Sequence, residues 1–227
     1  MPMLILGMHR SGTSCLAGCL QAAGLFLGEV KTQSTHNKKG NRENIAVMRL
    51  NDEVLASNGG SWRNPPASVV WTGSQLAEGK EVAGTIAREG SWGFKDPRAL
   101  LTLDGWLDIL GKVEFAASFR HPLAVARSLN RRDPALSIEE GLQLWQAYNE
   151  RLVSAAARFP IRLIDYDRSG EAYLDAVVRI AHDLALPEPE AAARFYDDNL
   201  RHQAIDETRP IPPALARTYA RLQELTW

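Results

Sequence analysis

The sequence is poor in cysteine and in long apolar runs, and it carries almost no net charge. Its 26 basic side chains nearly balance 27 acidic ones, which gives a formal charge of -1. This balance argues against duplex DNA or an anionic membrane surface as a partner. No stretch approaches the roughly 18 consecutive apolar residues that span a bilayer, and the early apolar run, residues 3–6, is too short for a signal peptide. We therefore expect a cytoplasmic protein.

The two cysteines, Cys15 and Cys19, lie four positions apart on a predicted helix. That spacing is about one helical turn, where a disulfide would need a strained geometry. A metal site that combined them with His9 would lack a fourth ligand at a suitable spacing. We expect two reduced packing residues and no metal.

The chain has enough apolar residues to bury a sizeable core, because 45% of its 227 residues are hydrophobic and 23% are charged. Disorder is thereby excluded, and the length suits one domain, residues 1–227. Short apolar segments predict buried strands at residues 3–6, 92–94, 113–119 and 161–164. Helical patterns lie between and after them, at residues 12–23, 44–56, 74–88, 103–110, 122–132, 138–158 and 171–184. This alternation predicts an α/β fold with a mainly parallel sheet of four to five strands, covered on both faces.

Two polar segments interrupt this alternation, residues 27–43 and residues 58–72. They are predicted surface loops of unusual length for a compact domain. Such loops are often lids or specificity loops, although ordinary variable insertions look the same in a sequence. Ligands of parallel sheets bind beyond the carboxyl ends of the strands, so residues at those ends are the first candidates for a site.

A glycine-rich loop follows the first predicted strand and leads into the first predicted helix. Residues 7–14 read Gly-Met-His-Arg-Ser-Gly-Thr-Ser. Amides in such a loop can converge on an anion, and the helix N-terminus adds the positive end of its dipole. The spacing matches a Walker A loop, except that Thr13 replaces the lysine that reaches the β and γ phosphates. The loop therefore predicts a phosphate site that fits a nucleoside triphosphate poorly, with Arg10 as its cation.

Charged residues also follow the second and third predicted strands. The second ends at Lys95-Asp96-Pro97-Arg98, where Pro97 stops the strand. An alternative for this segment is a surface salt bridge among Lys95, Asp96 and Arg98. The third strand is followed by Arg120, and Ser128 falls at the polar margin of the next helix. An arginine and a hydroxyl that flank one pocket suit a terminal phosphate group.

Together these motifs resemble the sulfotransferase family that uses 3′-phosphoadenosine 5′-phosphosulfate (PAPS) as its donor. Residues 8–14 are similar to the family's 5′-phosphosulfate loop. Arg120 and Ser128, eight positions apart, are similar to its 3′-phosphate motif. The resemblance implies a P-loop-containing three-layer α/β fold and no required metal.

The resemblance extends over residues 4–201 and is closest to bacterial sulfotransferases akin to the tyrosylprotein and carbohydrate branches. Three further segments carry it: residues 40–43, 60–62 and 95–97. One departure concerns the acceptor side, because Asn41 and Arg42 stand where bacterial relatives usually have an aromatic pair before the glutamate that matches Glu43.

The resemblance also assigns roles to individual residues. The residues expected to bind the donor are His9, Arg10, Ser11, Gly12, Thr13, Ser14, Arg120 and Ser128. Arg10 and Lys95 are expected to face the bridging oxygen, and Glu43 is expected to take the proton of the acceptor hydroxyl. PAPS would be the co-substrate and its desulfated form, PAP, the product. The acceptor would be a carbohydrate or another small metabolite, while its identity and the oligomeric state stay open.

Several features keep other interpretations open. Glu43 could be a helix N-terminal acid, in which case His36 is the next candidate base. Arg131 and Arg132 are expected to complement the dipole at a helix C-terminus. Trp62 and Trp71 could stack on a sugar, but packing is the commoner role of tryptophan.

Two other functions also fit parts of the sequence. A P-loop kinase is one, because residues 161–165 mimic a Walker B strand with its magnesium acid. A non-catalytic protein that binds PAP is the other, and in such a protein Lys95 and Glu43 would have no catalytic role.

Overall fold

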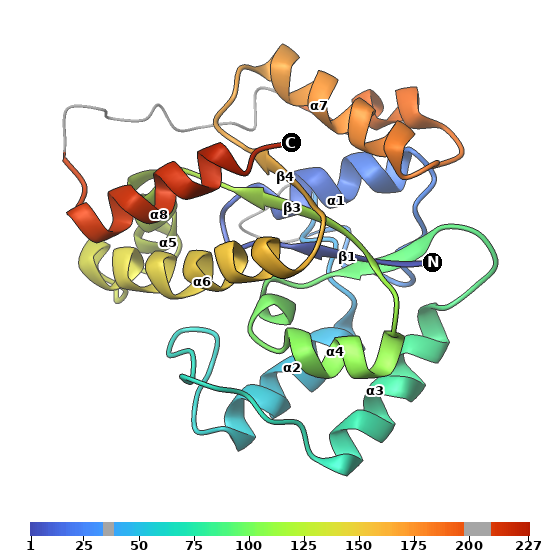
Figure 1. The fold of residues 1–227 in the computed structure, drawn as a ribbon, viewed down its shortest axis with the longest axis horizontal. Helices are drawn as coiled ribbons and strands as arrows, with labels where there is room; N and C mark the ends of the chain where they lie inside the picture. Colours follow the sequence, from blue (N-terminus) through green and yellow to red (C-terminus); the bar gives the residue numbers. More distant parts are fainter. Residues whose placement is uncertain (34–38, 198–209) are drawn as a thin grey trace.

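The structure is a computed structural model that describes residues 1–33, 39–197 and 210–227. At its centre four parallel strands form a sheet in the order β2, β1, β3, β4 (Figure 1). The strands are β1 (Pro2–Leu6), β2 (Trp92–Lys95), β3 (Glu114–Phe119) and β4 (Ile161–Asp165). The predicted α/β class and parallel sheet are confirmed, and each predicted strand ends within one residue of the observed one.

Helices surround the sheet, and α1 to α7 lie at the positions that the apolar periodicity predicted, whereas α8 was not assigned a range. The α-helices of the described residues are α1 (Thr13–Ala22), α2 (Ile45–Ser57), α3 (Gly73–Ile86), α4 (Leu103–Leu110), α5 (Pro122–Arg132), α6 (Ile138–Arg158), α7 (Gly170–Asp183) and α8 (Pro213–Glu224). Two short 3₁₀ helices, η1 (Pro97–Leu100) and η2 (Pro189–Arg194), were not predicted. Each is too short to show a helical period in the sequence.

The two faces of the sheet belong to separate apolar layers, because successive side chains of a strand point to opposite faces. Met3 and Ile5 of β1 pack with α1 and α7, whereas Leu4 and Leu6 pack with residues of α2, α4, α5 and α6. Figure 1 shows α1 and α7 on one side of the sheet and α2, α3 and α4 on the other. The expected three-layer arrangement is therefore present.

The strand register brings the predicted chemistry to one edge of the sheet. Ile5 of β1 pairs with Lys95 of β2, and Leu6 pairs with Ala117 of β3. Because the strands are parallel, the phosphate loop, Lys95 and Arg120 all lie at the carboxyl edge. Parallel α/β sheets place their ligands at this edge.

The two predicted loops border the same edge. In residues 27–33 and 39–43, the described parts of the first loop, the regular pairing is one isolated bridge from Val30 to Asn44. The candidate base His36 lies outside the described residues. Residues 58–72 contain no helix or strand. They are closed by two bonds between Asn58 and Val70: the Asn58 amide donates to the Val70 carbonyl (3.0 Å), and Val70 N–H donates back (2.9 Å). No helix in the described parts of the chain is long and apolar enough to cross a membrane.

Candidate active site

The phosphate loop, residues 7–12, is fixed by two glycines that no other residue could replace without strain. Gly7 has a φ of 131°, and a Cβ atom there would lie 2.2 Å from the Ser118 carbonyl oxygen of β3. Gly12 has a φ of 82°, and a Cβ atom there would lie 2.2 Å from the Tyr166 ring. Positive φ and such close approaches both favour glycine. The neighbouring strands therefore shape the loop directly.

The interior of the phosphate loop offers polar groups to an anion. Ser118 Oγ donates to the Ser11 carbonyl oxygen (2.6 Å), which anchors the middle of the loop. The Ser11 hydroxyl is buried without a hydrogen-bond partner among the described residues. At the start of α1 no side chain caps the helix, and its first turn contains no acidic residue. The first N–H groups of α1 can therefore bind an anion.

Arg10 connects the phosphate loop to α5. Its Nε donates to Ser128 Oγ (2.8 Å), and Ser128 is only 3% exposed, more buried than its predicted place at the polar margin of the helix. The Arg10 backbone has a φ of 67°, which a non-glycine residue seldom adopts. The structure thus brings together two residues that the sequence assigned to opposite ends of the donor.

Arg120 is held by an acid that the sequence did not single out. Its Nε donates to Asp167 Oδ1 (2.9 Å), and His121 N–H donates to Asp167 Oδ2 (2.8 Å). Asp167 follows the end of β4, next to the strand that precedes Arg120. An acidic residue just beyond a predicted strand was the only signal in the sequence that could have identified it.

Positive charge is concentrated around Arg10. Burial lowers the pKa of this guanidinium, and the neighbouring charges of Arg132, Arg120 and Arg131 lower it further. Several arginines close enough to oppose one another's charge form a suitable site for an anion with more than one negative charge.

Lys95 and Glu43 form a buried ion pair on the other side of the phosphate loop. Lys95 Nζ lies 2.6 Å from Glu43 Oε1, and the two side chains are 1% and 8% exposed. Lys95 also donates to Ser14 Oγ (3.4 Å), which itself donates to the Asn41 carbonyl oxygen (3.1 Å). Burial lowers the pKa of Lys95, while the Glu43 carboxylate opposes that change. The structure therefore brings two of the three predicted catalytic residues, Lys95 and Glu43, to the first turn of α1.

Glu43 lies directly before the N-terminus of α2. Asn44 is the N-cap of this helix, and its side chain accepts hydrogen bonds from Ala46 and Val47 N–H. The first turn of α2 contains no acidic residue. Glu43 is therefore outside the first turn, and both the catalytic role and dipole complement stay predictions for it.

The alternative of a surface salt bridge at residues 95–98 is wrong. Asp96 is fully buried and binds Arg98 through both its N–H (2.7 Å) and its guanidinium (3.1 Å), and Arg98 Nε also donates to Asp52 (2.6 Å). Lys95 points instead to Glu43. Burial raises the pKa of Asp96 to about 6, against the lowering effect of Arg98. The strand end thus carries two separate buried ion pairs.

His9 packs its ring against two aromatic side chains. Its ring lies 4.7 Å from the Trp62 ring and 6.0 Å from that of Tyr148, between ring centroids. It is 8% exposed, and its Nε2 has no hydrogen-bond partner among the described residues. Burial lowers the pKa of His9 well below 6.5, and the charges of Arg98 and Lys95 add to this effect. His9 is therefore a neutral ring, whose expected part in donor binding stays a prediction.

The two tryptophans of the second loop differ in their surroundings. Trp71 packs edge-on against Trp106, and its Nε1 donates to the Thr102 carbonyl oxygen (3.2 Å). The packing interpretation is confirmed for Trp71. Trp62, in contrast, lies beside the phosphate loop through its contact with His9.

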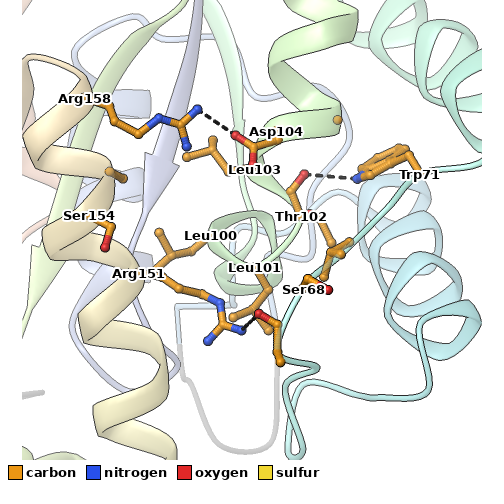
Figure 2. Close-up of a pocket in the computed structure, with 14 residues that line it drawn as sticks. Ser68, Trp71, Leu100, Leu101, Thr102, Leu103, Asp104, Arg151, Ser154 and Arg158 are labelled. Carbon is orange, nitrogen blue, oxygen red and sulfur yellow. Dashed lines mark hydrogen bonds and ion pairs between the residues drawn. The ribbon is translucent and has the colours of Figure 1, made fainter.

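A cavity of about 300 Å³ lies elsewhere, between α6, the start of α4 and residues 67–71. Figure 2 shows Arg151 and Arg158 of α6 across from Leu100, Leu101 and Leu103. None of the predicted site residues lines this cavity. The cavity and the candidate active site are therefore separate features.

The described residues contain no group of three histidine, cysteine, aspartate or glutamate side chains that could hold a metal ion. Cys15 and Cys19 are both free thiols.

Comparison with known proteins identifies the fold. No protein-family model matches the sequence, and no curated protein matches it. The sulfotransferase domain of the Synechococcus PCC 7002 olefin synthase is 17% identical, with 100% of this chain and 94% of that chain covered and a TM-score of 0.61. The sulfotransferase STF9 from Mycobacterium avium is 16% identical, with 99% and 74% covered and a TM-score of 0.52. At these identities the likeness concerns the fold, and the chain has the fold of the sulfotransferases.

Proposed function

We propose that the protein is a sulfotransferase that transfers a sulfuryl group from PAPS to a hydroxyl group of a carbohydrate or another small metabolite. One observation carries the proposal: the phosphate loop has the Lys95–Glu43 pair on one side and Arg10, Ser128 and Arg120 on the other. The two groups supply what the reaction requires, a pair for proton transfer and charge stabilisation and a separate anion site.

The residues present fit the donor. The buried Ser11 hydroxyl and the uncapped start of α1 suit a 5′-phosphate. Arg120 and Ser128 suit the 3′-phosphate, and Ser128 is joined to the loop by its hydrogen bond from Arg10. When bound, PAPS supplies a sulfuryl group already activated by its bond to the 5′-phosphate.

The buried ion pair explains how the chain itself would assist the transfer. Glu43, which pairs with Lys95, is the group that would accept the proton of an acceptor hydroxyl. Lys95 and Arg10 stabilise negative charge that builds on the oxygen released from the sulfuryl group. Cations placed in advance within a buried site stabilise such charge most strongly.

A P-loop kinase is less well supported at the same edge of the sheet. Its expected magnesium acid, Asp165, ends β4, and β3 separates this strand from the strand that leads into the phosphate loop. Asp165 also accepts a hydrogen bond from Asp167 N–H (2.9 Å). Thr13 takes the place of the Walker lysine. A kinase would therefore lack its phosphate-binding lysine, and its magnesium acid would lie two strands away from the phosphate loop.

Titration calorimetry tests the proposal directly. We expect PAP to bind without metal at micromolar affinity or better, and to stabilise the protein by about 2.7 kcal/mol at a hundredfold excess over its dissociation constant. ATP with magnesium should bind much more weakly. Binding of ATP that depends on magnesium, without any binding of PAP, would identify a kinase instead. Transfer assays with labelled PAPS and a panel of glycans, phenols and tyrosine peptides then separate an enzyme from a non-catalytic PAP binder.

A further inference from the structure

A cationic aromatic surface borders the phosphate loop on the side of residues 58–72. Its centre is the indole of Trp62, which contacts the His9 ring (4.7 Å) and the guanidinium groups of Arg63 (5.1 Å) and Arg132 (5.6 Å), measured to the ring centroids. We call Trp62, His9 and Arg132 the Trp62 surface. Trp62 is half-buried and Arg132 is exposed, so both can reach a molecule that approaches the phosphate loop.

The Trp62 surface is fixed to the rest of the molecule. Tyr148 of α6 donates its hydroxyl to the Trp62 carbonyl oxygen (3.2 Å), and Arg63 forms an ion pair with Asp133 just after α5. His9 is next to Arg10 in the phosphate loop, which places the indole beside the residues proposed to handle the sulfuryl group. An acceptor must present its hydroxyl at this point, so a ring of the acceptor can lie against Trp62.

Arg132 differs from three of the arginines around the site. Arg63, Arg98 and Arg120 each pair with an acidic side chain, whereas Arg132 has no ion pair with any residue in the described ranges. Its guanidinium lies over the Trp62 ring instead. Burial is the main cause of the lowered pKa of His9 and of Arg10, and Arg132 contributes to both. Its positive charge therefore acts on the phosphate loop.

The geometry of Arg132 suits an anionic ligand. A guanidinium group that lies over an indole keeps its hydrogen-bond donors free at the edge of its plane. A carboxylate matches these donors best, because its two oxygens can accept two parallel hydrogen bonds from the edge of the guanidinium. The sequence predicted that Arg132 complements the helix dipole at the end of α5. That role does not require a contact with the indole or a position near Arg10. Arg131, on the same last turn, can fill it equally well.

On the basis of the proposed sulfotransferase function, we propose that Arg132 and Trp62 select acceptors in which a ring carries a carboxylate near the hydroxyl that is sulfated. A phenolic acid and a uronic sugar both have this chemistry. Trp62 packs against the ring, and Arg132 binds the carboxylate.

Calorimetry on the PAP-saturated protein tests this inference with matched ligands. The phenolic pair is 4-hydroxyphenylacetate and its neutral amide, and the sugar pair is methyl glucuronide and methyl glucoside. For at least one pair we expect the carboxylate to bind about tenfold or more tightly than its neutral partner. Arg132→Gln should remove this preference, whereas the matched control Arg131→Gln should keep it. Both positions are exposed, so neither change should disturb folding.

The other outcomes separate the inference from the function on which it rests. Equal affinities within both pairs, or no binding of any of the four ligands to the PAP complex, would overturn the inference and leave the proposed function intact. A loss of PAP affinity in Arg132→Gln, with the carboxylate preference retained, would place Arg132 on the 3′-phosphate, one turn from Ser128. Failure of PAP itself to bind would overturn both proposals.

Discussion

The phosphate loop and residues 58–72 meet at His9, but different kinds of contact hold them in place. The phosphate loop continues β1, is closed by the backbone of β3 at Gly7, and ends at the first turn of α1. Residues 58–72 form no helix or strand, and side chains such as Tyr148 and Trp71 attach them to α6 and α4. The side proposed for the donor is thus held in place by the backbone, and the side proposed for the acceptor by individual side chains.

This difference has a consequence for function. A site formed by the backbone, such as the phosphate loop, tolerates few substitutions without loss of the fold, because it packs against the strands of the sheet. A surface held by side chains can change with single substitutions, since loops tolerate replacement better than the elements that they connect. We therefore expect substitutions on the donor side to reduce turnover or donor affinity, and substitutions on the acceptor side to change selectivity.

The largest effect is expected at Lys95. Lys95→Met should reduce turnover about a hundred- to a thousandfold, because a buried cation no longer stabilises the leaving oxygen. It should also lower the free energy of unfolding by about 3 to 5 kcal/mol, since Glu43 is left buried without its partner. The double variant Lys95→Met, Glu43→Gln should recover most of this stability but none of the turnover, as measured by denaturation and by transfer assays.

Glu43→Gln alone provides the matched comparison. It keeps the size of the side chain but cannot accept a proton, so turnover should fall about a hundredfold or more while PAP affinity stays level. Donor binding should weaken in Lys95→Met and not in Glu43→Gln. Near-normal turnover of Glu43→Gln would place the base elsewhere, with His36 as the next candidate. If turnover recovered in the double variant Lys95→Met, Glu43→Gln, the ion pair would have a structural role and no catalytic one.

A smaller effect is expected at the 3′-phosphate. Arg120→Ala should weaken PAP about ten- to a hundredfold by calorimetry, through loss of a charge-assisted contact. Adenosine 5′-phosphosulfate, which lacks the 3′-phosphate, should bind as it does to the wild type. Asp167→Asn is the control, because it removes the ion pair of Arg120 but keeps the arginine. Equal losses for both ligands, or the same loss of PAP affinity in Asp167→Asn, would mean that Arg120 acts only through the fold.

The same contrast explains what the sequence could predict. Local patterns predicted the strands, the phosphate loop and the positions of Lys95 and Arg120. This was possible because consecutive residues determine where a strand ends and where a helix begins. The contact between Lys95 and Glu43 joins residues 52 positions apart, and the bond between Arg10 and Ser128 joins residues 118 apart. No local pattern encodes such a pair.

The incorrect alternative at residues 95–98 has a similar origin. Neighbouring charges in a sequence suggest a surface salt bridge, since charged residues are seldom buried. Here Asp52 of α2 and Glu43 supply partners for Arg98 and Lys95 from other segments, which allows both cations to be buried. The burial of a charge therefore depends on tertiary partners that the local sequence does not show.

The smallest effect concerns His9, where the donor and acceptor sides touch. Because its pKa in the folded protein is well below 6.5, the unfolded chain binds a proton there below pH 6.5 and the folded chain does not. The free energy of unfolding should therefore fall as the pH decreases below 6.5, by up to about 1.4 kcal/mol per pH unit from this residue, and be independent of His9 above it. In urea denaturation at pH 5.5 and 7.5, His9→Gln should lack this part of the pH dependence, whereas His182→Gln, at an exposed position, should retain it. Identical pH dependence of His9→Gln and the wild type would show that Trp62 and Tyr148 do not shield His9 from water in solution.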